Sequence, residues 1–184
     1  NEDFEAGWNG WYADNGLWEV GAPEVGPDNA RSGSNCAGTV LAGNYTVDTD
    51  SRLISPAITL PGVSGYEEIN LYFWQWFSFE SSDWGMVQIQ EYNSSEKTWP
   101  DEWQDCGDKI RFSSGAWSSA RIDLTQYAGK RIHIAFYHSD VRESQHYPKQ
   151  STGWYIDDIE VFSKILTFDN PESFESSPTL QDLS

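Results

Sequence analysis

Residues Ile69–Phe79 read INLYFWQWFSF, in which two kinds of side chain alternate. Successive side chains of a β-strand point to opposite faces, so this alternation predicts a strand with two different faces. One face is apolar and is formed by Leu71, Phe73, Phe77 and Phe79. The other is wide and amphipathic and is formed by Tyr72, Trp74 and Trp76. A buried core on one side is therefore expected, with a surface on the other side that either binds something or is covered.

Similar runs recur along the chain between clusters of Gly, Pro, Asn and Ser. They are residues 1–7, 17–22, 36–41, 51–60, 68–80, 85–93, 119–124, 130–140 and 153–163. A helical signal is confined to one turn within residues 123–130, and the polar, Gly-rich segment 26–38 reads as a loop. Many short strands with almost no helix predict an all-β fold, a jelly-roll β-sandwich of two antiparallel sheets.

The composition excludes several classes of partner. The chain of 184 residues carries 29 acidic and 11 basic side chains, a net charge of −18, which disfavours nucleic acid and anionic membranes. Membrane insertion is not expected, because no apolar run reaches the roughly 18 residues that a spanning helix needs. The length suits one module. We expect it to occupy residues 1–163, with residues 164–184 as a linker or the start of a following module.

Cys36 and Cys106 are the only two cysteines. An even pair in a turn-rich, acidic chain indicates a disulfide and an oxidising compartment, and two free buried thiols are the alternative.

Six segments stand in a recognisable order. They are DFEAGWNGW from Asp3, WEVGAPEVGPDNARSGSNCAGT from Trp18, GNYTVDTDSRLISPAITLP from Gly43, INLYFWQWFSFESSDWGMVQI from Ile69, WSSARIDLTQYAGKRIHIAFYHSD from Trp117 and GWYIDDIEVF from Gly153. This order resembles the MAM-like, galactose-binding-type jelly-roll modules of secreted bacterial proteins. That group includes the cleaved-adhesin domains of gingipains and the accessory domains of immune-inhibitor-A-type peptidases. The resemblance covers residues 1–163.

The resemblance implies a non-catalytic module that bears a structural calcium ion and is joined to flanking domains of a larger secreted or cell-surface protein. Its expected role is adhesion or targeting through a glycan or an extracellular protein ligand. A dedicated carbohydrate-binding module of a polysaccharide-degrading enzyme is the alternative, and the catalytic domain itself comes third.

Adjacent acids interrupt the last strand-like run, at Asp157 and Asp158. Simple alternation places Asp157 on the face of Tyr155 and Ile159, and Asp158 on the opposite face. A buried carboxylate costs several kcal/mol unless a cation or hydrogen-bond donors compensate it.

Calcium takes six to eight oxygen ligands, chiefly carboxylates and backbone carbonyls. Because the first and last strands of such jelly rolls tend to be neighbours, we expect the acids of the two chain ends to converge. The predicted ligands are Glu5 and Asp157, then Asp158 and Asp3, with oxygens of Asp28, Ser34 and Asn35 from the loop. Pairing of these acids with Arg31, Arg52 or Arg131 is the alternative.

A ligand-binding face is predicted from three strands that each have one polar-aromatic side. Its residues are Tyr72, Trp74, Trp76, Gln88, Gln90, Arg131, His133 and Tyr137. If the strands share a sheet, flat rings could stack on sugars while amides and guanidinium groups bind hydroxyls. The alternative is that the long N-terminal loop covers Trp74 and Trp76. Trp18, Trp84, Trp99 and Trp103 lie in or beside loops and offer a second, rim-like site.

Catalysis finds little support. Glu80 and Asp83 lie in a predicted loop and are the best acid pair for a glycosidase, but a solvated acidic loop is the commoner explanation. No G-x-S-x-G motif is present, and His133, His138 and His146 lack a nucleophilic partner in sequence.

Overall fold

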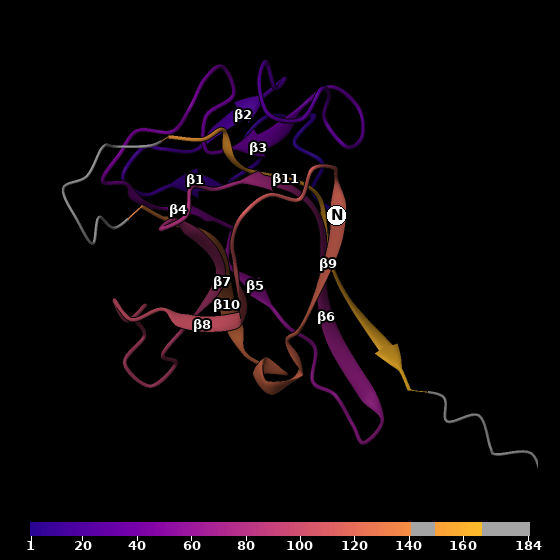
Figure 1. The fold of residues 1–184 in the computed structure, drawn as a ribbon. Coiled ribbons are helices and arrows are strands. Elements are labelled where there is room, and N and C mark those ends of the chain that lie inside the picture. Colours follow the sequence, from indigo (N-terminus) through magenta and orange to yellow (C-terminus); the bar gives the residue numbers. More distant parts are fainter. Residues whose placement is uncertain (141–149, 167–184) are drawn as a thin grey trace, which may run out of the picture.

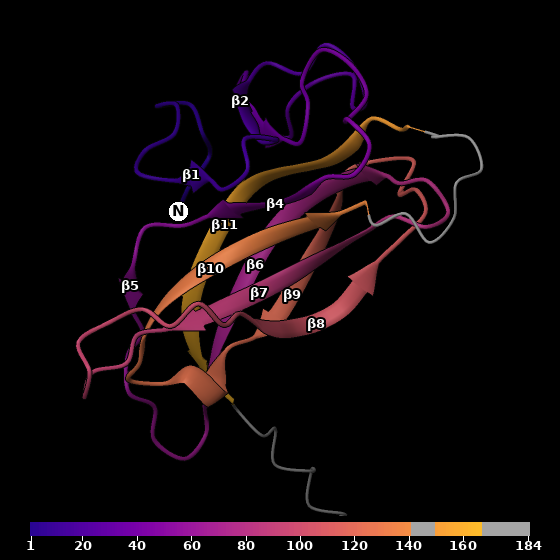
Figure 2. The same ribbon diagram turned by 90° about the vertical axis from the view of Figure 1, so that its left-hand side faces the viewer.

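A computed structural model describes residues 1–140 and 150–166, which form two antiparallel β-sheets (Figure 1). The strands are β1 (Tyr12–Ala13), β2 (Glu19–Gly21), β3 (Cys36–Gly38), β4 (Asp50–Ile54), β5 (Ile58–Thr59), β6 (Glu67–Ser78), β7 (Trp84–Glu91), β8 (Gln104–Ile110), β9 (Ser118–Asp123), β10 (Arg131–Ser139) and β11 (Gly153–Ile165). The first sheet has the order β1-β4-β10-β7-β8, with β5 also paired to β10, and the second has the order β2-β3-β11-β6-β9. Figure 2 looks onto the first sheet, with β8 curling outward at its edge.

Aromatic side chains from both sheets fill the core. Phe73 of β6 and Phe136 of β10 are fully buried, and their rings meet edge to face at 4.9 Å. Trp154 of β11 packs against Phe136 at 5.5 Å and donates its indole N–H to Gln75 Oε1 at 3.0 Å. The second sheet thus contributes Phe73 and Trp154 to contacts with Phe136 of the first, so the two sheets share one core. The predicted all-β sandwich is confirmed.

Strand boundaries differ from the prediction at the chain's N-terminal half. Residues 1–7 form no strand, because Phe4 has a φ of 56° and the chain turns after a single bridge between Glu2 and Ile159. The run 51–60 divides into β4 and β5 around Pro56, which cannot donate to a sheet ladder. The predicted helical turn is present as a 3₁₀ helix, η1 (Thr125–Tyr127), where Thr125 N–H donates to Asp123 Oδ1 at 2.8 Å.

Strand β8 was missed by the sequence analysis, because its sequence QDCGDKI is polar and contains glycine. It pairs with β7 and extends the first sheet beyond the predicted strands. Across residues 1–140 and 150–166, the structure contains no helix of the length and apolarity that crossing a membrane requires. Strand β11 runs to Ile165, so residues 164 and 165 of the predicted tail 164–184 belong to the strand, and residues 167–184 lie outside the described residues.

Candidate functional site

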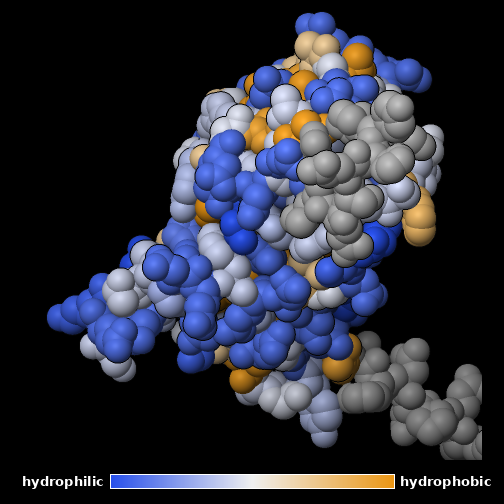
Figure 3. Space-filling model, turned by 60° about the vertical axis from the view of Figure 1, so that its left-hand side comes forward, coloured by the Kyte–Doolittle hydropathy of each residue, from blue (hydrophilic) through white to orange (hydrophobic). Residues whose placement is uncertain are grey.

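The outer face of the first sheet gathers five of the eight predicted ligand-binding residues. On β10, Ile132, Ile134 and Phe136 belong to the core, so Arg131, His133 and Tyr137 lie on the opposite face. On β7, Gln90 pairs with His133, and Gln88 pairs with the small Ala135. These five side chains therefore lie on one face of β7 and β10, where Arg131 is exposed and Gln88 and Tyr137 are only 6% and 8% exposed. Figure 3 shows that this side of the molecule is covered mainly by hydrophilic residues.

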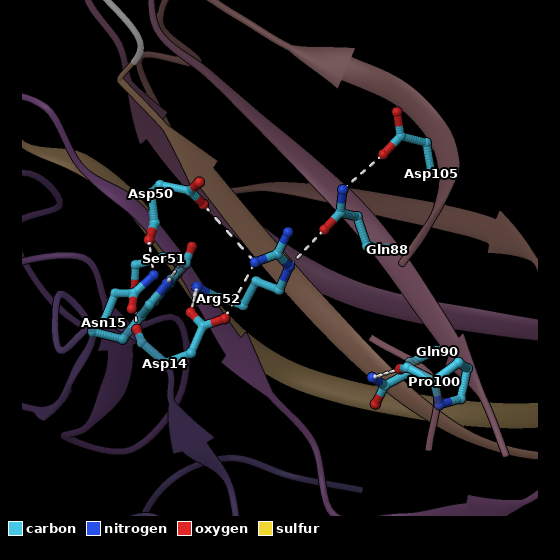
Figure 4. Close-up of polar contacts among 10 residues, drawn as sticks. Asp14, Asn15, Asp50, Ser51, Arg52, Gln88, Gln90, Pro100 and Asp105 are labelled. Atoms are coloured by element: carbon cyan, nitrogen blue, oxygen red, sulfur yellow. Dashed lines mark hydrogen bonds and ion pairs between the residues drawn. The ribbon is translucent and has the colours of Figure 1, made fainter. Parts of the chain in front are cut away.

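A row of polar contacts crosses this face from β4 to β8 (Figure 4). Arg52 Nε donates to Gln88 Oε1 at 2.8 Å, and Gln88 Nε2 donates to Asp105 Oδ1 at 2.8 Å. At the other end, Arg52 Nη1 lies 3.2 Å from Asp14 Oδ2 and 3.8 Å from Asp50 Oδ1. Because each side chain is fixed by its neighbours, the row is rigid before any ligand arrives.

Aromatic rings flank the row at one end of the face. Tyr137 lies between the Arg52 guanidinium, 4.3 Å from its ring centre, and Trp84, at 5.3 Å. Trp103 lies on the same guanidinium at 5.4 Å, and the Lys109 ammonium lies 4.0 Å over Trp84. Stacked cations and edge-to-face rings hold these aromatic planes in defined orientations.

A second aromatic group surrounds His133 further along β10. Its ring lies 4.1 Å from Trp99 and 6.4 Å from Tyr12. His133 Nδ1 is 2.6 Å from the Ser55 carbonyl oxygen, so this nitrogen carries a proton and donates it. Burial lowers the pKa of His133 below its usual value, which keeps the ring neutral at pH 7 and leaves Nε2 as an acceptor.

The other three predicted ligand residues, Tyr72, Trp74 and Trp76, lie on β6 in the second sheet. The prediction that they share one surface with Gln88 and His133 is wrong, because the two sheets turn their outer faces in opposite directions. The loop before β3 covers this region, as the alternative anticipated: Arg31 lies 4.0 Å over the Trp74 ring. Trp76 packs on Tyr155 at 5.5 Å.

Further residues lie on the first sheet's outer face. Of the four tryptophans predicted to lie in or beside loops and to offer a rim-like site, Trp84, Trp99 and Trp103 lie on this face, whereas Trp18 is buried in the core. Arg52 was considered only as a partner of the terminal acids. Its place between two carboxylates and an amide follows from strand pairing, which a single sequence does not disclose.

The N-terminal residues meet β11, the last strand, at the second sheet, as predicted. Glu2 and Ile159 exchange two backbone hydrogen bonds of 2.8 Å. Glu5 Oε1 accepts the N–H groups of Ser34 and Asn35 at 2.8 and 2.7 Å. We call the contacts of Glu5, Asp157 and Asp158 with residues 31–35 the terminal clasp.

Asp157 is the buried centre of the terminal clasp. Its Oδ2 accepts the N–H groups of Arg31 and Ser32 at 2.9 and 3.2 Å, and its Oδ1 accepts that of Asp158 at 2.7 Å. The Asp158 carboxylate accepts the Ser32 hydroxyl at 2.7 Å. Burial raises the pKa of Asp157 to about 6, and the charge of Asp158 adds to this while the three N–H donors oppose it.

A β-bulge between Asp157 and Glu160 corrects the simple alternation. Asp158 has a φ of 48° and shifts the register, so Ile159 joins the core while Asp157 faces the loop. The prediction that Asp157 and Ile159 share a face is therefore wrong, because the bulge inserts an extra residue.

The oxygen-rich residues of the terminal clasp are of the kind that calcium prefers. In residues 1–140 and 150–166, however, no three acidic, histidine or cysteine side chains are grouped so that they could hold a metal ion. Backbone N–H groups instead donate hydrogen bonds to the carboxylates of Glu5 and Asp157. Asp3 accepts the Glu5 N–H at 3.2 Å, and Asp28 is exposed on the loop. The calcium site stays a prediction.

The disulfide prediction is wrong for these two cysteines. Cys36 on β3 and Cys106 on β8 are free buried thiols in different sheets. Burial, with the nearby charges of Asp157 and Glu5, raises the pKa of Cys36 to about 12. The cysteines therefore give no support to an oxidising compartment.

The acid pair considered for catalysis is unsuited to a substrate. Asp83 is 1% exposed and accepts the Tyr45 hydroxyl and, at 2.9 Å, the Ser82 hydroxyl. His138 is fully buried, and burial lowers its pKa to about 4. His146 lies outside the described residues.

The geometry defines a class of protein, a two-sheet β-sandwich module with a fixed polar-aromatic sheet face. Solved structures with this fold include TmCBM61 in complex with β-1,4-galactotriose, at a TM-score of 0.53, 18% identity, and coverage of 89% of this chain and 96% of that one. They also include the CBM22-1 xylan-binding domain of Paenibacillus barcinonensis Xyn10C, at a TM-score of 0.52 and 12% identity, with coverage of 90% of this chain and 94% of that one. The K3 cleaved adhesin domain of Lys-gingipain from Porphyromonas gingivalis aligns at a TM-score of 0.46 and 18% identity, with coverage of 88% of this chain and 97% of that one. The neighbours with TM-scores above 0.5 share the predicted two-sheet β-sandwich fold.

One curated protein is more similar in sequence. Bacillopeptidase F of Bacillus subtilis (strain 168) is 33% identical over 166 residues, which are 89% of this chain. The chain spans about 10% of that protein's length. No protein-family model matches the chain.

Proposed function

We propose that this chain is a non-catalytic binding module that holds a glycan on the outer face of its first sheet. The observation that carries the proposal is the polar row from Arg52 through Gln88 to Asp105, flanked by aromatic rings at both ends of β10. Aromatic planes stack on the C–H faces of sugars, and fixed amide, carboxylate and guanidinium groups pair with hydroxyls. Glycan-bound neighbours of the same fold support this choice.

The dimensions of the face favour an oligosaccharide over a single sugar. His133 and Tyr137 are four residues apart on β10, which places their aromatic groups about 13 Å apart at roughly 3.3 Å per residue. Tyr137 itself is only 8% exposed, so the half-buried Trp84 and Trp103 are the rings of that group that a ligand would meet. A ligand that contacts both groups must therefore be longer than one pyranose ring.

A glycan array followed by titration calorimetry tests the proposal, with β-1,4-galactotriose and xylan-derived oligosaccharides among the probes. Trp99→Ala and Trp103→Ala should each weaken binding about tenfold, because each removes one stacking surface. Trp74→Ala on the second sheet is the matched control and should bind like the wild type. Silence of the wild type across the array would overturn glycan binding and favour a protein ligand.

We further propose that the module serves adhesion or targeting within a larger secreted or surface protein. The similarity to a segment of Bacillopeptidase F supports attachment to a protein of that kind. A calcium ion at the terminal clasp belongs to the same proposal. Chelation with EDTA should then lower the melting temperature, and a shift below one degree with no ion found by elemental analysis would refute it.

A further inference from the structure

A groove of about 620 Å³ opens at the Arg131 end of the first sheet's outer face. Pro100 lines it, and the Pro100 carbonyl also accepts Gln90 Nε2 at 2.6 Å. Gln90 in turn pairs with His133 on β10. The groove is therefore continuous with the aromatic group around His133.

Arg131 lines this groove and carries a positive charge that no described carboxylate pairs with. It is exposed, and its guanidinium lies 5.3 Å from the Tyr92 ring and 5.7 Å from the Trp99 ring. Among residues 1–140 and 150–166, no carboxylate pairs with it, although acids outnumber bases by 29 to 11 in the chain. Its neighbour Lys130 is already paired with Glu91 at 2.7 Å.

We infer that this groove receives the carboxylate of an acidic sugar, so that the module recognises a glycan carrying uronic acid units. The inference rests on the proposed function. A guanidinium presents N–H donors in a planar fork that matches a carboxylate, and the two aromatic rings hold it in place. The two other charged side chains of the groove, Lys130 and Glu91, are paired with each other at 2.7 Å. Asn93, Ser94 and Gln104 are neutral and suit sugar hydroxyls.

Position and charge limit the kind of acidic glycan. Arg131 and His133 lie on one face of β10, about 7 Å apart at roughly 3.3 Å per residue, so a sugar stacked at Trp99 places a substituent at Arg131. A net charge of −18 repels a densely charged polymer. The ligand is therefore a largely neutral chain with isolated acidic units.

Matched polymers test the inference with the full chain. Glucuronoxylan and an acidic arabinogalactan are each compared with the same polymer after chemical reduction of its carboxyl groups to alcohols. We expect carboxyl reduction to weaken binding of the preferred polymer about tenfold, the effect of roughly one charge-assisted hydrogen bond. The preference should decline as salt is raised.

Variants locate the effect. Arg131→Gln should abolish the preference, so that the native and the carboxyl-reduced polymer bind this variant equally. Lys164→Gln, which removes the same charge from the second sheet, should retain the preference. Melting temperatures within a degree of the wild type exclude misfolding. Equal binding of native and reduced polymers, or a preference that survives Arg131→Gln, overturns the inference alone, whereas failure of every polymer in both forms overturns the proposed function and the inference with it.

Discussion

The stability of the terminal clasp should fall as pH rises between 5 and 7.5 when calcium is absent. Asp157 is fully buried, and burial raises the pKa of its carboxyl from the usual value near 3.8 to about 6. The folded chain thus binds this proton more tightly than the unfolded chain does. The stabilisation is fully present below pH 3.8 and is lost as the pH rises through 6.

The size of the effect follows from the two pKa values. With about 6 in the folded state and about 3.8 in the unfolded state, the free energy of unfolding should drop by about 1.4 kcal/mol between pH 5 and pH 7.5. Urea unfolding in EDTA at both pH values measures it. Asp140, whose pKa burial also raises to about 6, contributes in the same direction.

Asp157→Asn separates the two carboxyls. The variant keeps Asp140 and loses the Asp157 titration, so its change between pH 5 and 7.5 should be about 1.4 kcal/mol smaller than that of the wild type. Identical pH dependence in the two proteins would refute the assignment. The same measurement with added calcium tests the proposed ion. A calcium ion at the terminal clasp would compete with the proton on Asp157, so the wild type should gain stability at pH 7.5 only.

Three other consequences can be measured on the same protein. Gly153→Ala should prevent folding or cost more than about 3 kcal/mol, because the new Cβ would lie 1.9 Å from Thr39 Oγ1 at a φ of 90°, and circular dichroism will report it. Gly62→Ala, which meets nothing within 4 Å, is its control. Arg52→Leu should lower the free energy of unfolding by about 2–4 kcal/mol, because Asp14 and Gln88 lose their charged partner; a cost below about 0.5 kcal/mol in urea would contradict the role of the polar row. The native chain should react with a thiol reagent only on unfolding, and dithiothreitol should leave its melting temperature unchanged, since both cysteines are buried and free.

The preformed face also has a general consequence for binding. Because Arg52 is hydrogen-bonded to Gln88 and Gln88 to Asp105, a sugar bound as proposed would meet groups that need little reordering. Ordering costs at the moment of binding are then small, which favours affinity even for a shallow face. The backbone of β7 and β10 beneath it should change little between the free and bound states.

Local sequence was sufficient for the fold class. The alternation in Ile69–Phe79 depends only on neighbouring residues, and the same period recurs in the segments that became β7, β10 and β11. The convergence of Glu5 and Asp157 also followed from the order of the segments. By contrast, β8 was not predicted, because its polar residues and glycine show no alternation of apolar and polar side chains.

Tertiary structure decided which faces come together. The polar-aromatic sides of β6 and β10 look alike in sequence, and only strand pairing assigns β6 to the second sheet and β10 to the first. The contact of Arg52 with Gln88 is likewise set by the register of β4 against β10 and of β10 against β7. After Asp157, one inserted residue forms a β-bulge and changes which face of the sheet the following side chains occupy. Periodicity is a property of consecutive residues, whereas pairing depends on contacts between residues far apart in the chain. Most of the strands could therefore be predicted from the sequence, but the composition of the first sheet's outer face could not.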